Sequence, residues 1–118
     1  MSLPVSPEEV ARDLFGAFAA SDPDRAAALF APHAKHRMVP LTPDVPFLGT
    51  IAGRDAIRDH LRTVWRRWRQ LRLDVHEIVA DRSRVAARAR VDAVERDGQR
   101  RLSTVAVYFL TIVDGAIV

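Results

Sequence analysis

The spacing of apolar residues changes once along this chain, near Leu71, and that change restricts the fold to a few architectures. Before Leu71 the apolar residues recur every three or four positions, which is typical of helices with one buried side. After Leu71 apolar and polar residues alternate, as in strands with one buried face. Helices followed by strands that short turns connect indicate an α+β fold with a mostly antiparallel sheet.

Three helices are expected in the first 70 residues. The first begins at the capping sequence Ser6-Pro7-Glu8-Glu9 and ends near Ala20. A second, shorter helix begins after Asp22 by the same combination of cap and proline, and a third follows Gly53. The apolar side of the third helix consists of Ile57, Leu61, Val64, Trp65 and Trp68.

Residues 34–39 are expected to form a short strand. The prolines at 40, 43 and 46 interrupt any continuous ladder after it, so residues 42–50 are expected to form a loop. The alternating pattern predicts later strands that begin at Leu71, run from 85 to 94 and run from 102 to 112. Asp114-Gly115 is a hairpin signal, and the strand after it has only begun at Val118. We therefore expect one domain over 1–118 that lacks most of its last strand.

Composition excludes several classes of protein. With 118 residues, 48% hydrophobic and 28% charged, the chain has the values of an ordinary globular domain, and it has no apolar run long enough to span a membrane. It contains no cysteine, so thiolate metal ligands are excluded, and its four histidines have no recognisable metal spacing. We expect no metal, no cofactor and no membrane partner. The N-terminus lacks the pattern of a secretory signal, which predicts a cytoplasmic protein.

The basic charge does not by itself indicate a nucleic-acid partner. The net charge is +3, with 18 basic and 15 acidic residues, and Lys35 is the only lysine. Arginines on the polar side of the third helix, such as Arg62 and Arg66, are expected to form a solvated face. An anion or nucleic-acid site on that face is the alternative, but no nucleic-acid motif accompanies the charge, so no nucleic acid is expected.

Arg90-Val91-Asp92 places a cation and a carboxylate on the same face of a strand that is otherwise apolar. If that face looks into a closed pocket, the arginine holds the acid in place and biases its protonation; if it looks into water, the pair means little. Ala87 and Ala89 lie on the opposite face, where their small size predicts close packing against a helix or a partner subunit.

The pattern resembles the nuclear transport factor two-like superfamily, which includes ketosteroid isomerases, SnoaL-like polyketide cyclases and limonene epoxide hydrolases. The resemblance rests on Leu29-Phe30-Ala31, on Gly53-Arg54-Asp55-Ala56-Ile57 and on Asp114-Gly115. It implies a cone-shaped, strongly curved sheet wrapped around three helices, an enclosed apolar pocket and a homodimer formed through the sheet. A small apolar organic molecule would be the ligand.

A more specific resemblance is to the limonene epoxide hydrolase branch, which has an Arg-x-Asp in a central strand. It implies that Asp92 donates a proton to an epoxide oxygen and that Arg90 holds it. The family's second aspartate would fall a few residues beyond Val118. The family's water-holding tyrosine and asparagine fall on His36 and Met38, so either His36 or that downstream aspartate would handle water.

The ketosteroid isomerase comparison places the family's catalytic carboxylate on Met38 and an oxyanion donor at about Tyr108. The pocket-lining residues that the resemblance implies are Phe15, Phe18, Met38, Trp65 and Tyr108. One of Phe15 and Phe18 is expected to face the pocket, and the sequence does not show which. The leading hypothesis is a small-molecule pocket protein that hydrolyses an apolar epoxide by acid-assisted attack of water. The alternatives are a non-catalytic ligand-binding or assembly module and an isomerase or polyketide cyclase.

Overall fold

The computed structural model describes residues 6–38, 49–98 and 100–118, and these residues form the α+β arrangement that the change of spacing predicts. In chain order the elements are α1 (Pro7–Ala19), α2 (Pro23–Ala27), β1 (Lys35–Met38), β2 (Gly49–Ala52), α3 (Arg54–Arg67), β3 (Trp68–Asp81), β4 (Arg84–Glu95), β5 (Arg101–Val113) and β6 (Ala116–Ile117). The three helices precede the main sheet along the chain.

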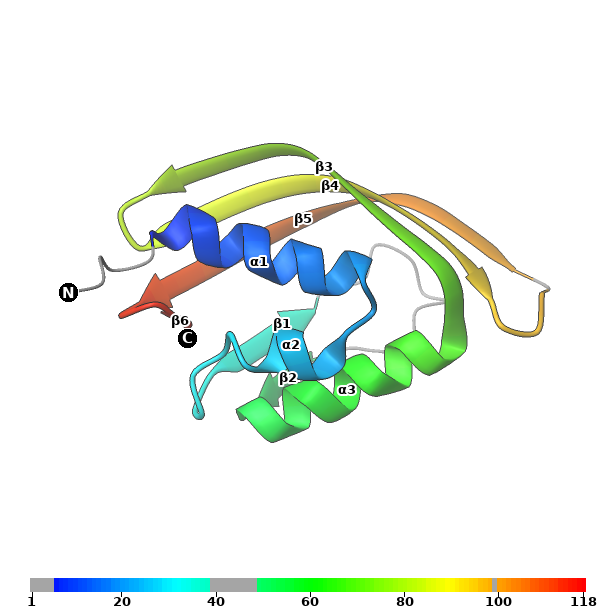
Figure 1. Ribbon diagram of the computed structural model, residues 1–118, viewed down its shortest axis with the longest axis horizontal. Coiled ribbons are helices and arrows are strands. Elements are labelled where there is room, and N and C mark those ends of the chain that lie inside the picture. The colour runs from blue at the N-terminus through cyan, green and yellow to red at the C-terminus, as the bar shows by residue number, and fades with distance from the viewer. Residues whose placement is uncertain (1–5, 39–48, 99) are drawn as a thin grey trace.

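The main sheet is antiparallel, with the strand order β3-β4-β5-β6, and a separate hairpin pairs β1 with β2. Figure 1 shows the long strands β3, β4 and β5 arching over α1, with α3 and the β1–β2 hairpin beyond α1 on the same concave side. The register between β3 and β4 shifts at 69–72 and at 75–77. Such irregularities bend a strand and increase its twist, which accounts for part of the curvature.

The helix starts follow the predicted capping chemistry. The Ser6 side chain accepts a hydrogen bond from the backbone N–H of Glu9 at 3.2 Å, and the Asp22 side chain accepts one from Arg25 at 3.0 Å. Gly53 precedes α3 with a φ of +97°, a backbone conformation that favours glycine. These three sites therefore determine where α1, α2 and α3 begin.

The third helix ends one residue earlier than its apolar spacing predicts. Trp68 is extended and pairs with Glu95 as the first residue of β3. The guanidinium of Arg67 donates hydrogen bonds from Nε (3.1 Å) and Nη2 (3.0 Å) to the Glu95 carboxylate, which is largely buried. The backbone carbonyl of Arg67 also accepts a bond from the N–H of Arg96. Pairing with the end of β4 therefore ends α3 at Arg67, where helical periodicity alone would continue the helix through Trp68.

Strand β2 is a second difference, because the sequence predicts a loop over 42–50. Residues Gly49–Ala52 instead pair with β1, in a register that sets His36 opposite Ile51. The remainder of the expected loop, 42–48, lies outside the described residues. A partner strand, rather than the local sequence, makes this short segment extended.

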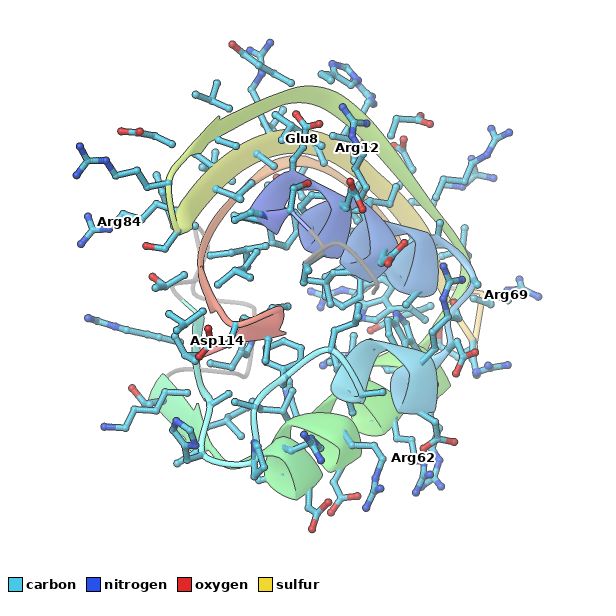
Figure 2. The ribbon with its side chains drawn as sticks, turned by 60° about the vertical axis from the view of Figure 1, so that its left-hand side comes forward. Glu8, Arg12, Arg62, Arg69, Arg84 and Asp114 are labelled. Carbon is cyan, nitrogen blue, oxygen red and sulfur yellow. The ribbon has the colours of Figure 1, made fainter. Side chains whose placement is uncertain are left out.

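The last described residues are joined to the rest of the fold by strand pairing and hydrogen bonds. After the turn at Asp114 and Gly115, Ile117 pairs with Ile112, accepts a hydrogen bond from the N–H of Ala31 and donates one to the carbonyl of Leu29. Ile117 is 2% exposed. The residues beyond the predicted turn therefore join the sheet edge to the segment after α2, and Figure 2 shows Asp114 at this turn.

One hydrophobic core lies between the helices and the concave face of the sheet. Leu14 and Ile57 are its largest fully buried helical side chains, and Val85 is the largest from the sheet. Ala87 and Ala89 are both buried on the concave face of β4, which α1 crosses. The sequence allowed either a helix or a partner subunit to pack against these alanines, and the structure shows that a helix, α1, does so.

Candidate functional site

Four aromatic side chains from three elements meet on the concave side of the sheet. Phe15 and Phe18 come from α1, Trp65 from α3 and Tyr108 from β5. The ring centroids are 5.3 Å apart for Phe15 and Tyr108, 5.8 Å for Phe18 and Trp65, and 6.0 Å for Phe18 and Tyr108. These are the separations of edge and tilted aromatic contacts. We call these four residues the aromatic cluster.

The aromatic cluster contains four of the five residues that the resemblance places in the pocket. The sequence left open which of Phe15 and Phe18 faces the interior, and the structure shows that both do. Met38 ends β1, but its side chain lies outside the described part of the chain. Burial raises the pKa of the Tyr108 hydroxyl, so at neutral pH this group is a protonated hydrogen-bond donor in an apolar setting.

Two histidines meet between β1 and α3. His36 is half-buried on β1, between the exposed Lys35 and Arg37, and its ring centroid is 5.9 Å from that of the buried His60 on α3. Burial lowers the pKa of His36; burial and the neighbouring His36 lower that of His60. Both rings are therefore neutral at physiological pH, and a neutral imidazole can accept or donate a proton.

His60 is a residue that the sequence reasoning missed as a partner for His36. Its signal was its position on the apolar side of the third helix, directly before Leu61 and three residues after Ile57. A histidine at such a position is buried with the apolar residues. The spacing does not show which strand packs against the His60 side chain.

Arg90 and Asp92 lie on the convex face of β4, away from the helices. Of the two positions that the sequence left open for this pair, the structure shows the one that faces water and not a closed pocket. The Nε of Arg90 is 3.3 Å from Oδ2 of Asp92, with 54% and 37% of the two side chains exposed. The inward positions of β4 belong to small apolar residues such as Ala89. Figure 2 shows Arg84, which shares the alternation of Arg90, pointing outward from the sheet.

The outer face carries an open hollow of about 560 Å³ beside this pair. Its lining residues are Arg72, Asp92, Ala93, Val94, Arg101, Leu102 and Ser103. A hydrogen bond from Ser103 is the main cause that lowers the pKa of the Asp92 carboxyl, and the charges of Arg90 and Arg72 act in the same direction. Asp92 is thus an ionised acceptor at neutral pH, whereas a general acid needs a raised pKa.

The polar side of α3 is a solvated face with ion pairs. Arg62 lies 2.9 Å from Asp24 in the first turn of α2, and Arg58 lies 3.4 Å from Asp55. Figure 2 shows Arg62 pointing outward at the α2–α3 side of the molecule. Carboxylates therefore already neutralise part of this face.

Neither a metal centre nor a membrane span is found over 6–38, 49–98 and 100–118. In these ranges no three histidine, aspartate or glutamate side chains are grouped so that they could hold a metal ion. The helices there are too short or too polar to cross a bilayer.

Comparison with solved structures shows which class of fold this chain has. An NTF2-like protein of unknown function from Burkholderia pseudomallei has a TM-score of 0.82 and 19% identity, over 96% of this chain and 86% of that one. A hypothetical protein with a ketosteroid isomerase-like fold from Catenulispora acidiphila, solved with trimethylamine, has a TM-score of 0.79 and 14% identity, over 92% and 79%. An LEH-like epoxide hydrolase from M. tuberculosis has a TM-score of 0.74 and 19% identity, over 94% and 76%.

At these identities the solved structures show the fold alone, which is the nuclear transport factor two-like fold. No curated protein sequence matches the chain. The family model of the SnoaL-like domain matches residues 11–118. The chain therefore belongs to the SnoaL-like domain family.

Proposed function

We propose that this protein binds a small, largely apolar organic molecule beside the aromatic cluster, between α1, α3 and the concave face of the sheet. The supporting observation is the cluster itself, because four aromatic rings from three elements converge there and include one partly buried hydroxyl, that of Tyr108. Apolar walls with a few placed polar groups are typical of small-molecule sites. Tyr108 would donate a hydrogen bond to an oxygen of the ligand.

Tryptophan fluorescence tests this proposal, because Trp65 and Trp68 are the two tryptophans of the chain and only Trp65 belongs to the aromatic cluster. In a Trp68→Phe variant, we expect a saturable change in Trp65 emission when terpene or polycyclic ligands are added. Adding Tyr108→Phe should weaken binding of an oxygenated ligand by roughly five- to tenfold, since one hydrogen bond is lost. The hydrocarbon analogue of that ligand should bind with equal affinity to the Trp68→Phe variant and to the variant that also carries Tyr108→Phe. If Tyr108→Phe weakened the binding of the oxygenated ligand and of the hydrocarbon equally, the proposed role of the Tyr108 hydroxyl would be contradicted.

Acid-assisted epoxide hydrolysis remains the more specific proposal, and the fold that this chain shares with an epoxide hydrolase supports it. The outward position and lowered pKa of Asp92 argue against this residue as the proton donor. If the protein converts terpene epoxides to diols, we expect Asp92→Asn to leave the rate within about twofold, because the group is not beside the proposed ligand site. A loss of a hundredfold or more would return Asp92 to the mechanism.

A non-catalytic binding module is the candidate that the position of Asp92 favours. Proton transfer of an isomerase or cyclase type is favoured instead by His36, a neutral base on the concave side. Product analysis with a ligand that binds saturably distinguishes the two candidates. Turnover that His36→Gln abolishes would support the enzyme, and binding without product would support the module.

The convex face is proposed to pair with a second copy of this chain, because its three long strands form complementary stripes. The acids Asp74, Glu77 and Asp81 lie on β3, and their cross-strand partners Arg90, Arg88 and Arg84 lie on β4. Along β5 the same face exposes Val105, Val107, Phe109 and Val113, of which Phe109 is 80% exposed. In a two-fold arrangement the apolar stripes meet each other while arginines approach the partner's acids.

A further inference from the structure

The rings of His36 and His60 are in contact across the boundary between the β1–β2 hairpin and α3. His36 belongs to the β1–β2 hairpin and His60 to α3, and their rings are tilted by 38°. His60 is 6% exposed, among the apolar residues of α3. The Nε2 atom of His36 is sealed from solvent and has no hydrogen-bond partner among the residues that the structure describes. A proton added at this atom would create a buried charge, which costs free energy.

The charged groups nearby differ in sign, and the neighbouring charge that lowers the pKa of His60 is that of His36. On β1 the flanking groups are Lys35 and Arg37, both cations that the alternation directs to the exposed face. On α3 the adjacent groups are Arg58, whose charge pairs with Asp55, and the exposed Asp59. Strand β2 presents no titratable side chain, because it reads Gly-Thr-Ile-Ala. Each imidazole also faces the other, so a proton on one opposes a proton on the second.

We infer that His36 and His60 form a proton-sensitive latch that holds the β1–β2 hairpin against α3 at neutral pH and releases it in mild acid. The two neutral rings pack together while the site is closed. When the hairpin separates from α3, each ring gains water and takes up a proton readily. This inference does not depend on the proposed ligand, since it concerns only the closure between the hairpin and the helix.

The direction of the pH effect follows from the lowered pKa values. Both rings have a pKa below 6.5 in the closed state, and a solvated ring in the open state has a pKa near 6.5. Above that value neither state binds a proton, so closure is fully stable. As the pH falls from about 6.5 towards the lowered values, only the open state binds protons, and closure is progressively lost.

Hydrogen exchange of the backbone amides at pH 7.5 and pH 5.0, corrected for intrinsic rates, tests the latch. In the wild-type chain we expect opening of β1, β2 and α3 to increase by about tenfold or more at pH 5.0, while α1 and β4 keep their protection. His36→Gln with His60→Gln should remove most of that increase, because neither residue then titrates. His33→Gln and His76→Gln are matched controls at exposed positions and should retain it.

Two results would overturn the inference. One is an equal acid-induced increase in the double glutamine variant. The other is a wild-type increase that is uniform over all elements, which would show global unfolding instead of a local release. If the double variant does not fold, the hydrogen exchange of the wild type and of the two control variants still tests the latch. Only a latch confines the acid-induced increase in opening to β1, β2 and α3.

Discussion

Replacing Leu14 with alanine should lower the free energy of unfolding by about 2–5 kcal/mol, the range for a buried leucine that leaves a cavity. Leu14 is 1% exposed on α1, where the helix lies against the concave face of the sheet. The next residue, Phe15, and Phe18 one turn later belong to the aromatic cluster. Loss of Leu14 would thus loosen the helix that carries half of the cluster. Urea unfolding followed by circular dichroism measures the change.

Leu102→Ala is the matched control, because the chemical change is the same at a half-buried position outside the core. It should cost less than about 1.5 kcal/mol, since little cavity forms at a site open to water. Equal losses for the two variants would contradict the placement of the core under α1. The Leu14 variant should also bind the cluster's ligand more weakly, as its helix is less firmly held.

Replacing Phe109 with glutamate should raise the dissociation constant of the proposed homodimer by about a hundredfold or more. Phe109 is 80% exposed in the single chain and lies on the apolar stripe of β5. In a two-fold dimer each substitution occurs twice, so two buried aromatic surfaces are lost and two carboxylates are placed against an apolar partner. Sedimentation velocity over a range of concentrations measures the shift from dimer to monomer.

Ala19→Glu adds the same carboxylate at an exposed position of α1 and should leave association unchanged. The free energy of unfolding of Phe109→Glu, measured at a concentration where the wild type is monomeric, should stay within about 1 kcal/mol of the wild type, because the side chain is exposed there. A wild-type protein that stays monomeric at millimolar concentration would contradict pairing through this face.

The candidate site shows where residue patterns are reliable and where they are not. Helical spacing correctly placed Phe18 and Trp65 towards the interior, because a helix with one apolar side has only one way to bury it. Strand alternation correctly placed Arg90 and Asp92 on one face together. Alternation does not say which face is concave, and a shift of one position exchanges the two.

The sequence alone determined the order of the elements, the starts of the helices and which side chains share a face. It did so because caps, turns and the hydrophobic period act over a few neighbouring residues. Only the tertiary structure decided that β2 is a strand, that Trp68 leaves α3, that His60 meets His36, and that Arg90 and Asp92 lie outside. Each of these depends on partners far away in the chain. Curvature of the sheet and packing of α1 on its concave face bring those partners together, and neither is encoded in any short stretch of residues.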